Sequence, residues 1–419
     1  MRPFLLAFTI AALSAAPLVS QRPPSLGTAG GYGGAAVTQA RRADAALWNP
    51  ALVGVYDGPV RTTSLLGFDA PAVPGSSAFE AAARLGLLSG RAEDARVERL
   101  GGPLFWRGRS PNTAVQLRWV AVQSRDLAMT FDTRASVAVG VPEGLARELG
   151  VTGVAPEVWE RGGASRSLTS VLTLARGTYL GRFPTVGRLW AGAAVKGWWV
   201  HEHATGAFLS DVPDVPVFRE TVLGNAGGVG LDAGVAGVLA GDRVWYGVAV
   251  SNAYATTFQP HRAPRTRTVD VIVGPAGEVE FQEAKGPEIR EDDPDAEAVA
   301  RARTLWDETR FPTMVRAGVA WDAAWGLVAL AASEQLSRGE LDAAGLEPAR
   351  TLAWSDRGGR FRVSYGWGRS RPAVAAAVSG GRCDRKWTAG LRHSPGTGVG
   401  LALDLSLSDW SCNLQGQGR

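Results

Sequence analysis

The stretch TGVGLALDLSLS, residues 397 to 408, decides the fold, because large apolar and small or polar side chains alternate through it without a break. The aliphatic residues Val399 to Leu407 occupy every second position, and the positions between them hold Gly, Ala, Asp or Ser. A period of two predicts a β-strand with one aliphatic face and one small, polar face. The same alternation occurs in residues 127–132 and 361–368.

Two all-β architectures have strands of this kind. In a soluble sandwich the small polar face meets water, whereas in a membrane barrel the aliphatic face meets lipid and the small polar face lines a lumen. Single-chain bacterial barrels have an even number of strands. We count fourteen candidate strands, at 59–68, 113–122, 126–137, 166–180, 186–200, 227–239, 242–253, 312–322, 326–337, 348–355, 360–369, 371–380, 385–393 and 397–409.

The connections between these strands alternate in length. Tight connections are expected at 123–125, 240–242, 323–325, 356–359 and 380–384, and long ones at 138–165, 201–226, 254–311 and 338–347. A membrane barrel places short turns at the periplasmic end and longer loops outside. The pattern therefore favours a transmembrane antiparallel β-barrel of about fourteen strands, with long extracellular loops and a last strand that pairs with the first.

The N-terminus indicates export. Arg2 precedes an apolar run from Phe4 to Val19, which is typical of a signal peptide over residues 1–20. The alternative is a membrane anchor, but the run is shorter than the ~20 residues that a spanning helix needs. We expect residues 21–58 to form a periplasmic or plug segment, residues 59–412 the barrel with an acidic external loop at 254–311, and residues 413–419 a tail.

Charge and tryptophan content add two expectations. The 44 basic residues exceed the 40 acidic ones by only four and are scattered, so we expect no nucleic-acid partner. Many of the 15 tryptophans lie near the ends of alternating runs, as in the aromatic girdles of membrane barrels, although a sandwich core would use them equally well. These tryptophans include Trp119, Trp190, Trp198, Trp199, Trp245, Trp321, Trp325 and Trp387.

Several motifs, in order, resemble a known family. Residues Asp44 to Leu52, with Trp48, Asn49, Pro50 and Ala51, resemble the Asn-Pro-Ala segment near the mature N-terminus of FadL-like and PorV-like outer-membrane barrels. The run Gly228 to Gly234 is similar to the Gly-Leu-Asp-Leu-Gly strand of that family, and Val248 to Asn252 to the strand after it. The resemblance implies a barrel of about fourteen strands whose N-terminal segment, with Trp48 to Ala51, plugs the lumen.

Charged residues recur on the polar faces of the expected strands, at Arg118, Asp132, Arg134, Arg316, Arg362, Arg392 and Asp404. In a barrel these side chains point into the lumen. They are candidates to hold the carboxylate or phosphate of a ligand by charge-assisted hydrogen bonds. The alternative is an internal network of ion pairs that stiffens a narrow barrel.

The sequence gives no sign of catalysis or of a cofactor. His201 and His203 fall on one face of an extended segment, but no third metal ligand accompanies them. No serine nucleophile elbow and no zinc-protease helix is present in the sequence, so a barrel hydrolase is disfavoured and we expect neither enzyme nor metal site.

The two cysteines flank the last two strands. Cys383 precedes the strand at 385–393 and Cys412 follows the strand at 397–409. Because adjacent antiparallel strands bring the chain back to the same end, both thiols should lie at one rim, where an oxidising periplasm favours a disulfide.

Two functions remain open. The first is a bacterial outer-membrane barrel, surrounded by lipid, that binds or passes a hydrophobic or amphipathic small molecule. The second is a non-transporting barrel whose external loops dock a secretion or surface partner. An apolar pocket beneath the loops would favour transport, and a sealed barrel filled with Arg–Asp pairs would favour docking.

Overall fold

The structure is a computed structural model. It describes residues 35–40, 42–55, 61–71, 112–140, 163–209, 217–239, 241–258, 264–273, 279–290, 311–336, 350–356, 360–367, 373–382, 385–394 and 398–409, with single positions between 294 and 309. The predicted signal peptide, Cys383 and Cys412 lie outside these residues, so the signal peptide and the disulfide stay predictions.

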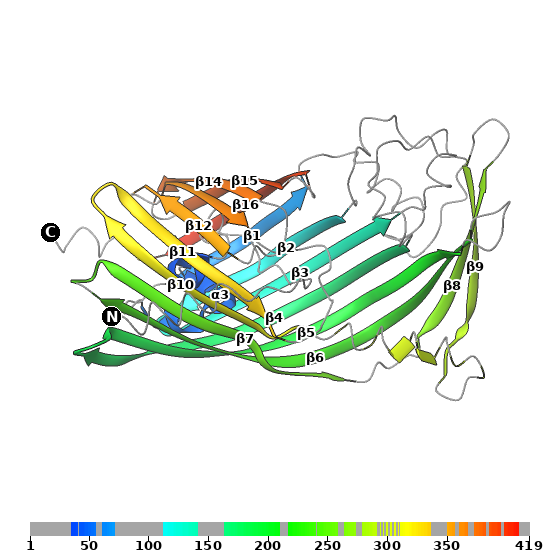
Figure 1. The fold of residues 1–419 in the computed structure, drawn as a ribbon, viewed down its shortest axis with the longest axis horizontal. Helices are drawn as coiled ribbons and strands as arrows, with labels where there is room; N and C mark the ends of the chain where they lie inside the picture. Colours follow the sequence, from blue (N-terminus) through cyan, green and yellow to red (C-terminus); the bar gives the residue numbers. More distant parts are fainter. Residues whose placement is uncertain are drawn as a thin grey trace.

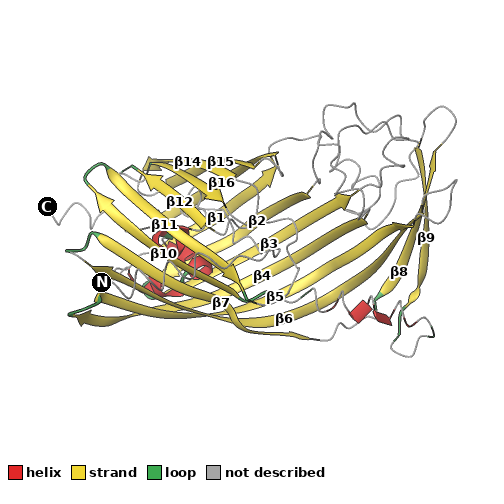
Figure 2. Ribbon diagram, viewed as in Figure 1, coloured by secondary structure: helices red, strands yellow, loops and turns green. Residues whose placement is uncertain are grey.

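Strands dominate the described chain (Figures 1 and 2). They are β1 (Arg61–Pro71), β2 (Asn112–Ser124), β3 (Leu127–Gly140), β4 (Gly163–Phe183), β5 (Gly187–Leu209), β6 (Val217–Leu239), β7 (Val244–Phe258), β8 (Arg265–Val273), β9 (Val279–Glu288), β10 (Met314–Ala323), β11 (Gly326–Gln335), β12 (Arg350–Ser355), β13 (Phe361–Trp367), β14 (Ala373–Arg382), β15 (Arg385–Ser394) and β16 (Gly398–Asp409). Four short helices precede them: α2 (Ala36–Gln39), η3 (Arg42–Asp44), α3 (Ala45–Trp48) and η4 (Pro50–Val55).

Fourteen of the sixteen strands pair in a ring, all antiparallel. The pairings run from β1 through β7, continue from β10 through β16, and return to β1. The first and last strands pair from Arg61 with Asp409 to Pro71 with Gly400. The alternating stretch at 397–408 thus forms the strand that closes the ring, as the sequence predicts, and the number of barrel strands is fourteen.

The tight turns fall where they were expected. They join β2 to β3 at Arg125–Asp126, β6 to β7 around Gly241–Asp242 and β10 to β11 at Ala324–Trp325. Gly241 and Asp242 both have positive φ, at 64° and 70°, which is the backbone of the turns that suit the twist of a β-hairpin. We call this end of the barrel the turn end.

The predictions of two long loops, at 201–226 and 254–311, were wrong. Most of 201–226 is strand, because β5 continues to Leu209 and β6 begins at Val217. Within 254–311, β8 and β9 form a hairpin that pairs with the start of β6. β4, β5 and β6 contain 21, 23 and 23 residues, so they extend far past the other strands at the end opposite the turns (Figure 1). Large apolar and polar side chains do not alternate regularly in residues 201–209 and 217–226, so the sequence pattern did not mark these extensions.

The residues that alternate in the sequence form two different faces of the barrel wall, one on the outside and one on the inside. Leu127, Phe131, Phe361 and Val363 are exposed on the outside, whereas neighbours such as Asp132 are buried inside. Exposed aliphatic and aromatic side chains continue around the ring, including Leu172, Val195, Leu231, Val248, Val319, Leu330, Leu352 and Leu391. The tryptophans divide: Trp119, Trp199, Trp321, Trp325 and Trp387 are exposed, while Trp190 and Trp198 are buried.

The four short helices lie inside the ring (Figure 2). Nearly every described residue from Ala35 to Gly54 is buried, against strands that include β4 to β7 and β10. We call residues 35–55 the inner segment. Among the described residues, no helix is both long and apolar enough to cross a membrane.

Candidate binding site inside the barrel

A row of glycines on the inner wall receives the inner segment. Gly177 of β4 pairs with Gly192 of β5, which pairs with Gly234 of β6. A Cβ at Gly177 would lie 2.7 Å from the Pro50 carbonyl oxygen, and one at Gly192 would lie 2.5 Å from the same atom. The backbone of the inner segment therefore touches the wall where the wall has no side chains.

Asn49 fixes the inner segment in this position. Its side-chain amide donates to the Val37 carbonyl at 3.1 Å and to the Val235 carbonyl of β6 at 3.1 Å. Its side-chain oxygen accepts from the Ala51 amide at 3.1 Å. Gln123 of β2 donates to the Val53 carbonyl at 3.0 Å. The predicted plug residues Asn49, Pro50 and Ala51 thus form the contact with the wall.

Arg118 connects the inner segment to β2 and β3, next to the glycine row in the wall. Its guanidinium donates to Asp132 of β3, at 3.0 Å from Nε to Oδ1, and to Asp44 of the inner segment. All three residues are buried. Two of the predicted lumen residues, Arg118 and Asp132, therefore form an ion pair, and the sequence analysis missed Asp44 as their third member.

Arg316 of β10 lies above Trp48. Its Cζ atom is 5.6 Å from the centre of the Trp48 ring, and its Nη1 donates to Ser251 Oγ at 2.7 Å. A guanidinium over an aromatic face is attracted by the ring quadrupole. A predicted lumen residue, Arg316, is thus in contact with a predicted plug residue, Trp48.

Lys196 of β5 adds a cation that the sequence analysis missed. Its Nζ lies 2.6 Å from Asp232 Oδ2, and Arg134 and Arg316 are close enough to repel its charge. The alternation of the sequence could have predicted that both members of this pair point inward. Lys196 shares a face with Ala194 and Trp198, and Asp232 lies on the polar face of the Gly228–Gly234 run. Lys196 and Asp232 thus form an ion pair between β5 and β6.

Asp232 also holds an irregular part of β7. Its Oδ1 accepts from the backbone amide of Asn252 at 2.7 Å, and Asn252 has a φ of 52°. The register between β6 and β7 shifts here, so Ser251 and Asn252 are both buried. The Asn252 side chain donates to the Pro312 carbonyl at 2.9 Å, which ties β7 to the entry of β10.

An apolar cluster lies beyond these charges, toward the long-loop end. It comprises Val171, Trp198, Val200, Leu223, Ala226 and Phe311. The Trp198 and Phe311 rings meet edge to face at 4.9 Å, and Trp198 Nε1 has no hydrogen-bond partner among the described residues. Charged and apolar surfaces are therefore adjacent in the interior.

The other predicted lumen residues lie on β13, β15 and β16. Arg362 of β13 is buried and donates to Ser379 Oγ of β14 at 2.6 Å. Arg392 lies in β15 opposite Gly400, and Asp404 lies in β16 opposite Gly67 and Thr388. The side chains of Arg392 and Asp404 are outside the described residues.

The two histidines do not share a face, contrary to the sequence-based expectation. His201 is exposed and His203 is buried, because the register between β4 and β5 shifts beside Val200 and Glu202. His201 Nε2 lies 2.9 Å from Ser170 Oγ on the outer surface, and Ser170 in turn contacts Thr133 at 3.1 Å. Among the described residues, no cluster of three or more His, Cys, Asp or Glu could hold a metal ion.

Comparison with known proteins gave matches to solved structures only. No protein-family model matches the chain, and no curated protein matches it. A FadL homologue from Pseudomonas aeruginosa matches with a TM-score of 0.45 and 11% identity over 94% of this chain and 99% of that one. The TodX deltaS2S3 mutant, a monoaromatic hydrocarbon channel, matches with a TM-score of 0.42 and 11% identity over 87% and 94%.

A third match is the translocator domain of the autotransporter NalP from Neisseria meningitidis, with a TM-score of 0.30, 7% identity and coverage of 85% and 89%.

Proposed function

We propose that this protein is a bacterial outer-membrane β-barrel that binds a hydrophobic or amphipathic small molecule in its interior and passes it across the membrane. The observation that carries the proposal is that Lys196, which pairs with Asp232, lies two residues before Trp198 on the same face of β5, beside the apolar cluster that contains Trp198 and Phe311. Such a site offers a cationic group to the head of a ligand and an apolar wall to its tail.

The outer surface supports the membrane location. Aliphatic and aromatic side chains such as Leu174, Val195, Leu231 and Tyr254 are each 47 to 61% exposed and lie in direct register on four adjacent strands. A soluble monomer rarely exposes apolar patches beyond a few hundred Å², whereas the outside of a membrane barrel is an apolar band.

The inner segment supports regulated passage. It is held to the wall at the glycine row by close backbone contact and at Arg118 by ion pairs. We propose that a ligand in the interior site must displace part of this segment before it leaves toward the turn end. Arg316 links this segment to the wall, because it stacks on Trp48 and donates to Ser251 of β7.

Binding of a C12 carboxylate and of the matching C12 alcohol to the purified protein tests the proposal. Arg316→Gln should weaken carboxylate binding about tenfold, since a charge-assisted hydrogen bond contributes about 1.5–3 kcal/mol, and should leave alcohol binding unchanged. Arg176→Gln is the matched control, because Arg176 is exposed and pairs with Asp126 on the surface. Equal carboxylate binding by wild type and Arg316→Gln would contradict the role of Arg316. If neither the carboxylate nor the alcohol binds to the wild-type protein, the proposed function is contradicted.

A docking function is the alternative. It is favoured by the β8–β9 hairpin, which, among the strands that the structure describes, pairs with β6 alone and stands outside the ring. Deletion of residues 265–288 separates the two functions. Unchanged C12 carboxylate binding by the shortened protein supports transport through the interior.

A further inference from the structure

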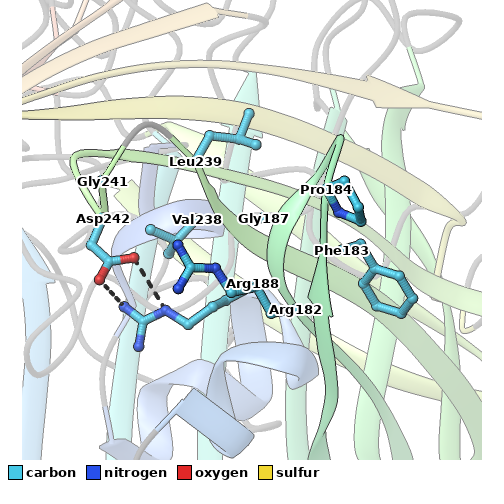
Figure 3. Close-up of a pocket in the computed structure, with 9 residues that line it drawn as sticks. All are labelled: Arg182, Phe183, Pro184, Gly187, Arg188, Val238, Leu239, Gly241 and Asp242. Atoms are coloured by element: carbon cyan, nitrogen blue, oxygen red, sulfur yellow. Dashed lines mark hydrogen bonds and ion pairs between the residues drawn. The ribbon is translucent and has the colours of Figure 1, made fainter.

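A hollow of about 430 Å³ opens at the turn end, away from the interior site. The β4–β5 hairpin contributes Arg182, Phe183 and Arg188 to it, and the β6–β7 hairpin contributes Val238, Leu239 and Asp242. Figure 3 shows the two arginine side chains beside each other near Asp242, with Phe183 and Pro184 across the hollow.

The charges around this hollow do not balance. Arg182 and Arg188 lie directly opposite each other in the β4–β5 register, an arrangement in which like charges repel. Asp242 neutralises only Arg188, through contacts of 2.9 Å from Nη2 to Oδ2 and 3.2 Å from Nε to Oδ1. Arg182 is exposed and, in the part of the chain that the structure describes, has no carboxylate partner. One positive charge therefore remains for an anion.

Apolar surface adjoins this charge. Phe183 is 42% exposed, and Tyr179 and Leu180, on the same strand end, are 46% and 49% exposed. Trp321 and Trp325, beside the β10–β11 turn, are exposed as well, at 51% and 59%. Exposed aromatic rings mark the level of the lipid headgroups in a membrane barrel. The unpaired arginine thus lies at the end of the protein where headgroups are found.

We propose that this hollow binds the phosphate of an anionic amphiphile. Arg182 and Arg188 would donate to the phosphate oxygens, since the planar guanidinium suits two-point contact with phosphate, and the apolar chain would lie against Phe183. The site involves no residue of the interior, so it does not depend on the proposed transport function.

Titration calorimetry of the full chain in a neutral detergent tests the site with dodecyl phosphate and with inorganic phosphate. The reference protein and every variant carry Arg316→Gln, which weakens the proposed interior site for anionic amphiphiles. Arg182→Gln should weaken dodecyl phosphate binding about tenfold, the effect of one lost charge-assisted hydrogen bond. Asp242→Asn should strengthen it, because Arg188 loses its competing carboxylate, and asparagine accepts the positive φ of position 242. Arg176→Gln changes the net charge equally but removes a paired surface arginine, so it should have no effect.

Three results would overturn the proposal. One is equal dodecyl phosphate binding by the reference protein and by Arg182→Gln, and another is weaker binding by Asp242→Asn. The third is inorganic phosphate binding as tightly as dodecyl phosphate, which would show a free-phosphate site without a contribution from the apolar chain. A difference in gel mobility between boiled and unboiled samples of each variant confirms that its barrel is folded.

Discussion

At the scale of single residues, the interior combines buried charge with close partners. Removing one partner of a buried ion pair is costly because the other charge then stays in a poorly solvated place. Arg118 is the sharpest case, since it pairs with both Asp44 and Asp132 and is only 1% exposed. The Arg176–Asp126 pair on the surface is the natural comparison, with side chains 71% and 38% exposed.

Arg118→Met should therefore destabilise the protein by about 3–5 kcal/mol. Arg176→Met should cost about 0–1 kcal/mol, because exposed pairs are screened by water and salt. Urea unfolding followed by tryptophan fluorescence measures both changes. Similar unfolding midpoints for the two variants would show that Arg118 does not bridge the two carboxylates.

At the scale of elements, the inner segment and the wall fit each other through backbone contact. β5 offers a matched pair of glycines for a test. A Cβ at Gly192 would collide with the Pro50 backbone, whereas one at Gly197 would meet nothing within 4 Å. The same substitution thus has different consequences five residues apart on one strand.

Gly192→Ala should loosen the inner segment, and Gly197→Ala should leave it in place. Limited proteolysis with identification of the new N-terminus measures this, and cleavage between residues 35 and 55 should accelerate only in Gly192→Ala. Equal cleavage of both variants would count against close contact at the glycine row.

The elements also show what sequence can and cannot predict. Alternation located the barrel strands because each crosses a medium that demands one apolar face, as in Leu127–Asp132 and Phe361–Ser364. The charged faces placed Arg118, Asp132 and Arg316 inside correctly. The glycine row was not predictable, because Gly177, Gly192 and Gly234 become neighbours only through the register of three strands. The β8–β9 hairpin was missed although Val269, Val271 and Val273 alternate in β8, because the segment was interpreted as an acidic loop.

At the scale of the whole molecule, the tryptophans divide between two environments. Trp321 is 51% exposed on the outer surface, whereas Trp198 is 3% exposed inside. In a membrane, only the first should touch lipid.

Brominated lipids, which quench fluorescence by contact, should therefore distinguish the two rings in reconstituted vesicles. Replacing Trp321 by Phe should reduce the quenched fraction of the emission, and replacing Trp198 by Phe should raise it, because an unquenched emitter has been removed. The opposite pattern would place the apolar face of the wall inside the barrel and contradict the membrane location.

The pairing of β1 with β16 has a consequence for biogenesis. Arg61 and Asp409 are neighbours in the ring although almost the whole described chain separates them, and contacts so distant in sequence form slowly because loop closure costs entropy first. Until that last pairing forms, both strands present open edges that can recruit other chains. The twelve-residue strand β16 is therefore needed before the barrel can close. A chain truncated before this strand should accumulate as an aggregation-prone intermediate that depends on chaperones.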